Sequence, residues 1–385
     1  MIKEIVDKEL CCGCEACASI CPRSAIEIAL DDEGFRRPYI KENCIECRAC
    51  QNVCPVRVDL RNMVLAYEKN AYYAATDDIA FNSSCSSGGI ATALSIQFIM
   101  NGGIVYGAAY SDTFADVIVK RIDNCDDLDC LKGAKYVQSN KMNFYKSIKE
   151  DLESGMKVLY IALPCEIAAL RSYLKYSTTL LYTIDLICHG PTSLFGLRDY
   201  IDKHRSKDDP IIEMNMRYKR NNKWTPYYMH ISCQDGTTFE EPFWPSDFGF
   251  LFARFARPSC YKCRFKGQYR FSDITIGDAW GAPNDIIEKN QSGLSMVIVN
   301  SPKGRELFDS SQVIHKIEAD YEMLVSGNPN IENVRIKEKE RDSISKMLRE
   351  KGLSETVKRN KTIRRRIFDF LRAIKKRIII CDGRK

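Results

Sequence analysis

Residues 11–22 read CCGCEACASICP and residues 44–55 read CIECRACQNVCP, so one short cysteine pattern occurs twice near the start of the chain. Each copy contains the spacing C-x2-C-x2-C-x3-C followed by a proline. This spacing lets one loop wrap three thiolates around a cubane cluster, while the fourth cysteine, held away by the turn at the proline, ligates a second cluster. The two copies therefore predict a compact, duplicated α+β domain over residues 1–62 with two 4Fe-4S clusters.

The predicted ligand sets exchange their fourth cysteine between the two copies. The ligands of the first cluster are Cys11, Cys14, Cys17 and Cys54, and those of the second are Cys44, Cys47, Cys50 and Cys21. Structural zinc is the alternative, although zinc sites typically pair C-x2-C knuckles across a long spacer. Cys12 has no place in the pattern, and we expect it to be a free thiol.

Composition limits the class of protein. The chain has 385 residues, 45% of them hydrophobic, which is enough for a buried core and two or three domains. Its 18 cysteines are not preceded by a signal-peptide pattern, so we expect a reducing, cytoplasmic setting and cysteines that act as ligands. No apolar run approaches the roughly 20 residues of a membrane-spanning helix.

The charge is concentrated at the C-terminal end. Residues 358–385 carry a net charge of +10, whereas the whole chain carries +6. The rest of the chain is therefore mildly acidic, and we expect no nucleic-acid partner. Apolar residues recur at helical spacing between these cations. Residues 356–385 therefore predict a basic amphipathic tail, which could lie peripherally on the anionic inner face of a membrane. RNA or an acidic partner, or a merely solvated helix, are the alternatives.

Apolar strands alternate with helical stretches over residues 72–310. Buried strands are predicted at residues 158–163, 181–188 and 295–300, and a helix at residues 88–100 is followed by a strand at residues 104–109. This alternation predicts an α/β domain with a mixed, partly parallel sheet. The polar residues 311–355 predict a helical extension before the C-terminal helical tail.

Two further cysteines follow predicted strands. Cys165 and Cys188 come at the ends of buried strands, so in a parallel sheet they emerge at one edge, where open α/β sheets bind cofactors. Cys260 and Cys263, spaced C-x2-C, could complete a four-thiolate site. We predict that these four cysteines hold a third 4Fe-4S cluster. Ordinary core cysteines or a mononuclear zinc site are the alternatives.

Two segments are candidates for binding a flavin. The turn Ser86, Ser87, Gly88 and Gly89 opens a helix, so its backbone N–H groups and the helix dipole suit a pyrophosphate; a plain helix cap is the alternative. The second segment supplies a cation, a ring and hydrogen-bonding groups suited to a flavin ring or a phosphate, with a solvated loop as the alternative. These residues are Lys135, Tyr136, Gln138 and Ser139.

Two more residues are candidates for catalysis. His189 follows Cys188 and could donate a proton to reduced flavin or substrate, although a hydrogen bond to a cluster sulfur is the role we favour. Asp278 follows a predicted strand at residues 274–276 and would lie near the cofactor edge. An ordinary turn at the end of that strand is an equal alternative.

Six blocks resemble the coenzyme F420 hydrogenase/dehydrogenase beta-subunit family. They are SSGGIATAL (86–94), GAKYVQS (133–139), LPCEIAAL (163–170), DLICHG (185–190), RPSCYKCRFK (257–266) and SDITIGDAWG (272–281). The first 62 residues look like a bacterial-type dicluster ferredoxin domain. Because that family contains flavin-dependent iron-sulfur oxidoreductases, the resemblance implies FAD and also supports the third cluster.

The resemblance and the cysteines together predict an oxidoreductase. Electrons would pass from a redox partner protein, a ferredoxin-like donor or an oxidoreductase subunit, through three 4Fe-4S clusters to FAD and an organic substrate or coenzyme. The alternative is a non-catalytic electron-transfer subunit that serves a partner protein. An enzyme needs a pocket beside an open flavin face, whereas a transfer module needs only an exposed cluster edge.

Overall fold

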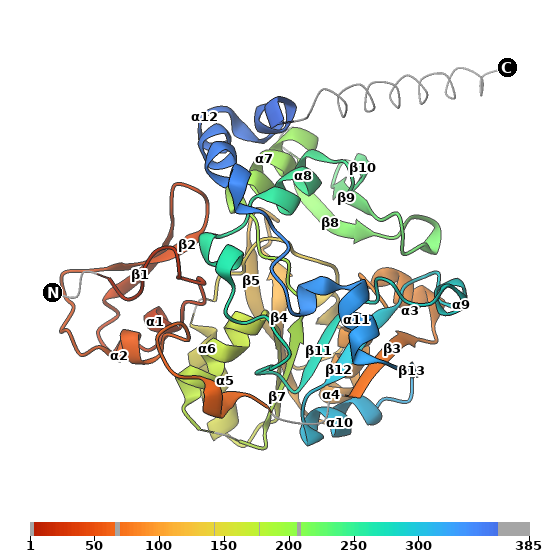
Figure 1. Cartoon of the computed structure of the whole chain (residues 1–385), viewed down its shortest axis with the longest axis horizontal. Coiled ribbons are helices and arrows are strands. Elements are labelled where there is room, and N and C mark those ends of the chain that lie inside the picture. Colours follow the sequence, from red (N-terminus) through yellow and green to blue (C-terminus); the bar gives the residue numbers. More distant parts are fainter. Residues whose placement is uncertain (1–3, 66–69, 142, 177, 206–208, 361–385) are drawn as a thin grey trace.

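The computed structural model describes residues 4–65, 70–141, 143–176, 178–205 and 209–360. An eight-stranded sheet forms the centre of the molecule, with a small N-terminal domain on one side and a helical cap at one end (Figure 1). The predicted amphipathic helix of the basic tail falls within residues 361–385 and lies outside the described residues.

The N-terminal domain repeats its backbone as well as its sequence. A short helix carries the third cysteine of each copy, α1 (Ala16–Ser19) in the first and α2 (Ala49–Asn52) in the second. Equivalent positions have positive φ, at Gly13 and Glu15 in one copy and at Glu46 and Arg48 in the other. An antiparallel hairpin, β1 (Ile26–Leu30) and β2 (Arg36–Ile40), joins the copies.

The central sheet is mixed and partly parallel, as the sequence predicts. In spatial order its strands are β13 (Ile314–Ala319), β3 (Asn70–Thr76), β12 (Ser295–Val299), β11 (Ile274–Asp278), β7 (Leu181–Leu186), β6 (Val158–Ala162), β4 (Ile104–Tyr110) and β5 (Val117–Ile122). The four strands β11, β7, β6 and β4 run parallel, and the outer pairs are antiparallel. Their carboxyl ends therefore meet at one edge.

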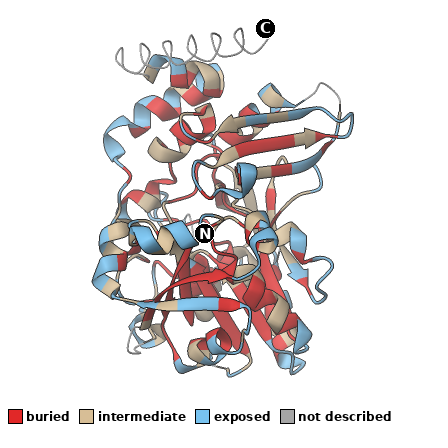
Figure 2. Cartoon of the chain, turned by 90° about the vertical axis from the view of Figure 1, so that its right-hand side faces the viewer, coloured by how far each residue is buried: buried red, intermediate tan, exposed pale blue. Residues whose placement is uncertain are grey.

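Helices cover both faces of this sheet. On one face lie α5 (Phe144–Glu153) and α6 (Pro164–Leu174), with α9 (Asn284–Lys289) and α11 (Tyr321–Gly327) further along; α3 (Ile79–Ser84), α4 (Ile90–Met100) and α10 (Pro302–Asp309) complete the domain. Along β6, Tyr160 packs toward α5 and α6, whereas Leu159 packs toward α4 and α10. This period-two alternation leaves most residues of the strands at the centre of the sheet buried, and Figure 2 shows these strands largely in red.

A helical cap with its own small sheet is inserted between β7 and β11. It consists of α7 (Leu194–His204), β8 (Ile211–Tyr218), β9 (Tyr228–Cys233), β10 (Thr238–Pro242) and α8 (Asp247–Arg254), and α12 (Arg341–Asn360) packs on it. Met216, Phe248 and Leu348 belong to one hydrophobic cluster there. The sequence pattern did not indicate this second core.

The prediction of a purely helical extension over residues 311–355 is wrong at β13. This strand pairs antiparallel with β3 and extends the central sheet. From Lys316 to Ala319, exposed charged side chains alternate with half-buried apolar ones, which suits an edge strand. The α/β domain therefore continues beyond residue 310, and helical structure resumes at α11 and α12.

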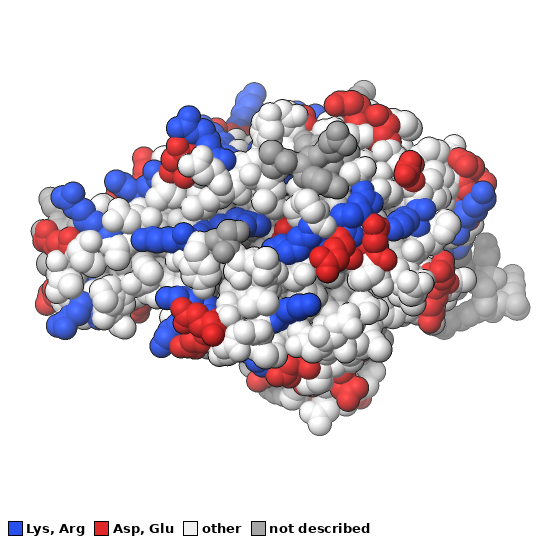
Figure 3. All heavy atoms as spheres, turned by 90° about the horizontal axis from the view of Figure 1, so that it is seen from below, with Lys and Arg blue, Asp and Glu red and all other residues white. Residues whose placement is uncertain are grey.

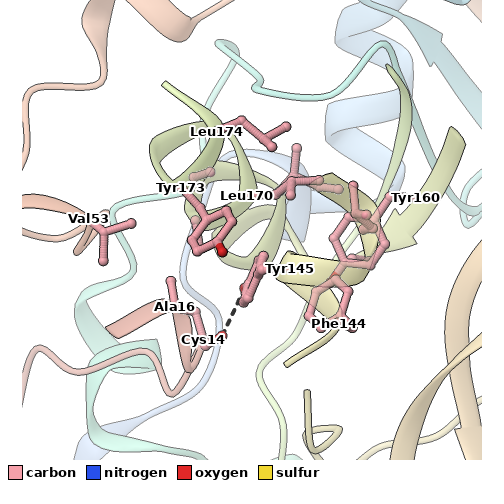
Figure 4. Packing of buried hydrophobic residues seen from close by; sticks show 14 of the residues in the cluster. Cys14, Ala16, Val53, Phe144, Tyr145, Tyr160, Leu170, Tyr173 and Leu174 are labelled. Carbon is pink, nitrogen blue, oxygen red and sulfur yellow. Dashed lines mark hydrogen bonds between the residues drawn. The ribbon is translucent and has the colours of Figure 1, made fainter. Parts of the chain in front are cut away.

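The N-terminal domain shares its hydrophobic core with the α5 and α6 layer. Ala16 and Val53 belong to the same buried cluster as Tyr145 and Tyr173 (Figure 4). The Tyr145 hydroxyl donates a hydrogen bond of 2.8 Å to the carbonyl oxygen of Cys14. These contacts fix the cysteine loops against the sheet.

The outer surface bears charges of both signs. On the face seen from below, Lys and Arg side chains are interspersed with Asp and Glu (Figure 3). Within the described ranges, the helices are all too short or too polar to cross a lipid bilayer.

Candidate functional site

The first cysteine site lies inside the N-terminal domain. Cys54 of the second copy lines the same small cavity as Cys11, Cys14 and Cys17 of the first, and all four residues are buried. Burial raises the pKa of the Cys54 thiol to about 11. Four thiols in such surroundings ionise readily only when a cation accompanies them, and an iron-sulfur core supplies that positive charge.

The second cysteine site lies closer to the surface. Cys21 of the first copy joins Cys44, Cys47 and Cys50 around another cavity. Cys47 is exposed, and the neighbouring Ile45 side chain is 57% exposed. Each cavity is therefore lined by three cysteines of one copy and the fourth cysteine of the other, as the spacing predicts, and the second site is the more exposed of the two.

Replacing Cys17 by alanine tests this grouping. The variant should lose about four of about twelve iron atoms per chain, because one cubane ligand is removed from the first site. Iron and sulfide analysis of anaerobically purified protein measures the loss. An unchanged iron content would reject the assignment.

A third group of cysteines meets at the edge of the sheet. The parallel neighbours β6 and β7 place Cys165, at the start of α6, and Cys188, just after β7, at the same edge. A 3-10 turn at Pro258–Lys262 brings Cys260 and Cys263 to the same cavity. Burial raises the pKa of the Cys188 thiol to about 11.

Cys12 connects the first and third sites. It is buried and lines both cavities. Hydrogen bonding with Cys14 and Cys165 holds the pKa of the Cys12 thiol well below its usual value. The cysteine spacing leaves this residue unassigned, and its position next to Cys11 is the only sequence signal that could have placed it here.

A larger cavity, of about 580 Å³, opens at the carboxyl ends of the parallel strands. Aromatic side chains line it both from the cap, at Tyr227, Trp244 and Phe252, and from the α/β domain, at Tyr136, Tyr160 and Trp280. Cys188 and His189 line both this cavity and the third site. The two spaces are therefore adjacent, separated by the loop that follows β7.

Most of the predicted flavin-binding residues line this larger cavity. They are Ser86, Ser87, Gly89, Lys135, Tyr136 and Ser139. Gly88 instead faces the sheet, where its N–H donates to Ser295 Oγ at 2.9 Å and a Cβ would lie 2.5 Å from the carbonyl oxygen of Ala74. Gly88 is thus needed for helix-to-sheet packing, and a bulky replacement would disturb the fold as well as any ligand.

Gln138 lies outside the larger cavity, and the ammonium group of Lys135, which lines that cavity, is engaged by the backbone. Gln138 lines the third site and not the larger cavity, because its amide donates to the carbonyl oxygen of Cys12 at 2.8 Å and accepts from Arg257 at 2.6 Å. The Lys135 ammonium caps a 3-10 helix through three backbone carbonyl groups at 2.6–3.2 Å. Burial lowers the pKa of Lys135 to about 7.

The two catalytic candidates lie on the wall of the larger cavity. The buried Nε2 atom of His189 has no hydrogen-bond partner, and burial lowers the pKa of this imidazole to about 4. Asp278 forms an ion pair with Arg217 and accepts a hydrogen bond of 3.3 Å from Trp224 Nε1. Arg217 in turn lies over the Tyr227 ring at 4.3 Å, a contact that the sequence did not indicate.

Comparisons with known proteins agree with this organisation. Residues 10–58 match the 4Fe-4S dicluster domain, and residues 155–322 match the family model that describes the C terminus of the coenzyme F420 hydrogenase/dehydrogenase beta subunit. No curated protein matches the chain. A chain of the F420-reducing NiFe hydrogenase complex from Methanosarcina barkeri is similar, with 17% identity, 75% of this chain and 89% of that chain covered, and a TM-score of 0.46. The chain therefore joins a 4Fe-4S dicluster domain to a domain of the family formed by the C-terminal regions of coenzyme F420 hydrogenase/dehydrogenase beta subunits.

Proposed function

We propose that the chain is an iron-sulfur flavoprotein oxidoreductase. In this proposal two clusters in the N-terminal domain and a third on Cys165, Cys188, Cys260 and Cys263 connect a redox partner protein to FAD. The FAD lies in the larger cavity, beside an organic substrate or coenzyme. When bound, a flavin exchanges single electrons with iron-sulfur centres and electron pairs with organic molecules.

The continuity of the four spaces carries this proposal. Burial is the main cause that raises the pKa of the Cys17 thiol in the first site, and Cys50 of the second site lies close enough to contribute to the same shift. Cys12 lines both the first and the third cavity, and Cys188 lines both the third and the larger one. A series of adjoining sites that begins at an exposed edge and ends in a ligand-sized cavity is the arrangement that an electron-carrying enzyme requires.

The walls of the larger cavity fit a flavin. Tyr136 and Phe252 supply rings whose centroids are 4.3 Å apart, suited to covering an aromatic ligand. Ser86, Ser87 and Gly89 line the cavity at the start of α4, where backbone N–H groups suit a phosphate. His189 stays neutral at pH 7, and its unpartnered Nε2 can hydrogen-bond to a ligand or to a cluster sulfur.

Anaerobic purification followed by iron, sulfide and flavin analysis tests the proposal. We expect about twelve iron atoms, for three 4Fe-4S clusters, and about one non-covalent flavin per chain. About eight iron atoms would reject the third cluster. The family description of a beta subunit favours a second candidate, an electron-transfer subunit of a larger complex. Full iron without flavin would support that candidate and reject the enzyme.

A further inference from the structure

Arg257 is a fully buried cation that forms no ion pair with a carboxylate among the described residues, and a second cation, Arg37, lies close enough to interact with it. The Arg257 side chain is 0% exposed. The guanidinium donates from Nη1 to the carbonyl oxygen of Arg36 at 3.1 Å and from Nη2 to Gln138 Oε1 at 2.6 Å, while its buried Nε has no partner. The nearby carboxylates of Glu15 and Glu166 pair with other cations. Because a buried charge is costly without a counter-ion, this arrangement points to negative charge close to the guanidinium.

The side chain lies between the first and third cysteine sites. Its acceptor residue Arg36 lines the first-site cavity, and its other acceptor, Gln138, lines the third-site cavity. The backbone of Arg257 belongs to the third site, because its carbonyl oxygen accepts a hydrogen bond of 2.9 Å from the N–H of Cys260. The guanidinium group of Arg257 thus extends from the cysteine loop of the third site to that of the first site.

The first-site loop is shaped to receive this guanidinium. Gly13 lies between two cysteines of that loop and has φ +66°, and a Cβ built on it would lie 2.5 Å from Arg257 Nη2. Only glycine combines this backbone conformation with such a close approach. The Gln138 amide that accepts from Arg257 also donates to the carbonyl oxygen of Cys12, which fixes the loop on its other side.

We propose that Arg257 is the shared counter-charge of the first and third clusters and raises the reduction potentials of both. This inference rests on the proposed function, since it requires the third cluster. A cubane with four thiolate ligands carries net negative charge, and reduction adds one electron to it. A nearby buried cation therefore stabilises the reduced form more than the oxidised form. None of these contacting residues lines the cavity of the second site, which is also more exposed, so this site serves as an internal reference.

Redox titration followed by electron paramagnetic resonance tests the proposal on the full chain. Arg257→Gln should keep its iron and shift two of the three midpoint potentials to lower values, leaving the second-site potential unchanged. Arg257→Lys, which keeps the charge, should restore both potentials most of the way. Arg254→Gln is the matched control, because this half-buried arginine three residues earlier pairs with Glu340 and does not line any of the four cavities described above. Its three potentials should match those of the unmodified protein.

A second substitution decides the question if Arg257→Gln loses iron. Gln138→Glu places a carboxylate against the guanidinium and cancels its charge, so the same two potentials should fall. Unchanged potentials in an iron-replete Gln138→Glu variant, or an equal shift at the second site, would overturn the proposal. Failure of the proposed function looks different, because unmodified protein with only two clusters would be recognised from its iron content before any titration.

Discussion

Replacing Cys188 by alanine should remove about four iron atoms per chain, whereas replacing Cys12 by alanine should leave the iron content unchanged. Both cysteines line the third-site cavity, which makes Cys12 a demanding control. Cys188 follows β7 at the shared edge of the parallel strands, together with Cys165, while Cys12 also belongs to the first-site loop. The iron content of the two variants should differ because Cys188 belongs to the four proposed ligands of the third cluster and Cys12 does not.

Iron and sulfide analysis after anaerobic purification measures this result. The electron paramagnetic resonance spectrum of the Cys188→Ala variant should retain the signals of the two N-terminal clusters, because Cys188 lies outside the loops that hold those clusters. Loss of iron from Cys12→Ala together with full iron in Cys188→Ala would assign the third site to a different set of thiols. Full iron in both variants would contradict a third cluster at this edge.

Replacing Ala134 by tryptophan should empty the larger cavity of flavin without loss of iron. Ala134 belongs to a partly exposed loop on the cavity wall, so a large side chain there occupies ligand space and leaves the core intact. Overpacking costs about 1–3 kcal/mol, which corresponds to an affinity loss of about 5- to 140-fold. The ratio of flavin to protein, measured after release of the cofactor by acid, gives the occupancy.

Ala80→Trp provides the matched control, because Ala80 is exposed on α3 and does not line the cavity. It should retain flavin at the level of the unmodified protein. Equal flavin occupancy in the two tryptophan variants would place the flavin elsewhere. This test is sharper than a substitution at Gly88, whose close packing against Ala74 would disturb the sheet itself.

The parts of the fold that depend on local spacing could be predicted from the sequence. The two cysteine runs specify their own loops, and strongly apolar stretches such as β6 and β12 read directly as buried strands. Parallel pairing of β6 and β7 then brings Cys165 and Cys188 to one edge, as predicted. Each of these inferences needs only a short window and one general rule of topology.

The rest depends on tertiary contacts that no short window contains. Gln138 and Lys135 lie within four residues of Ser139 in the sequence, but their side chains have different partners. The Gln138 amide connects two cysteine loops, whereas the Lys135 ammonium caps a 3-10 helix. Arg217 reaches the cavity from the inserted cap, which has no counterpart among the sequence blocks. The prediction at β13 is wrong because a short, charged edge strand resembles a polar helix until its partner is known.

The shared core of the N-terminal domain and the α5 and α6 layer has a kinetic consequence. A freely diffusing ferredoxin must find its acceptor, so its reaction rate depends on concentration and on ionic strength. Here Val53 and Tyr145 belong to one buried cluster, and the cysteine loops are held in place by contacts such as the one between Tyr145 and Cys14. Transfer from the first site to the third would therefore be a first-order process within one folded body, and its rate should not change on dilution or with added salt.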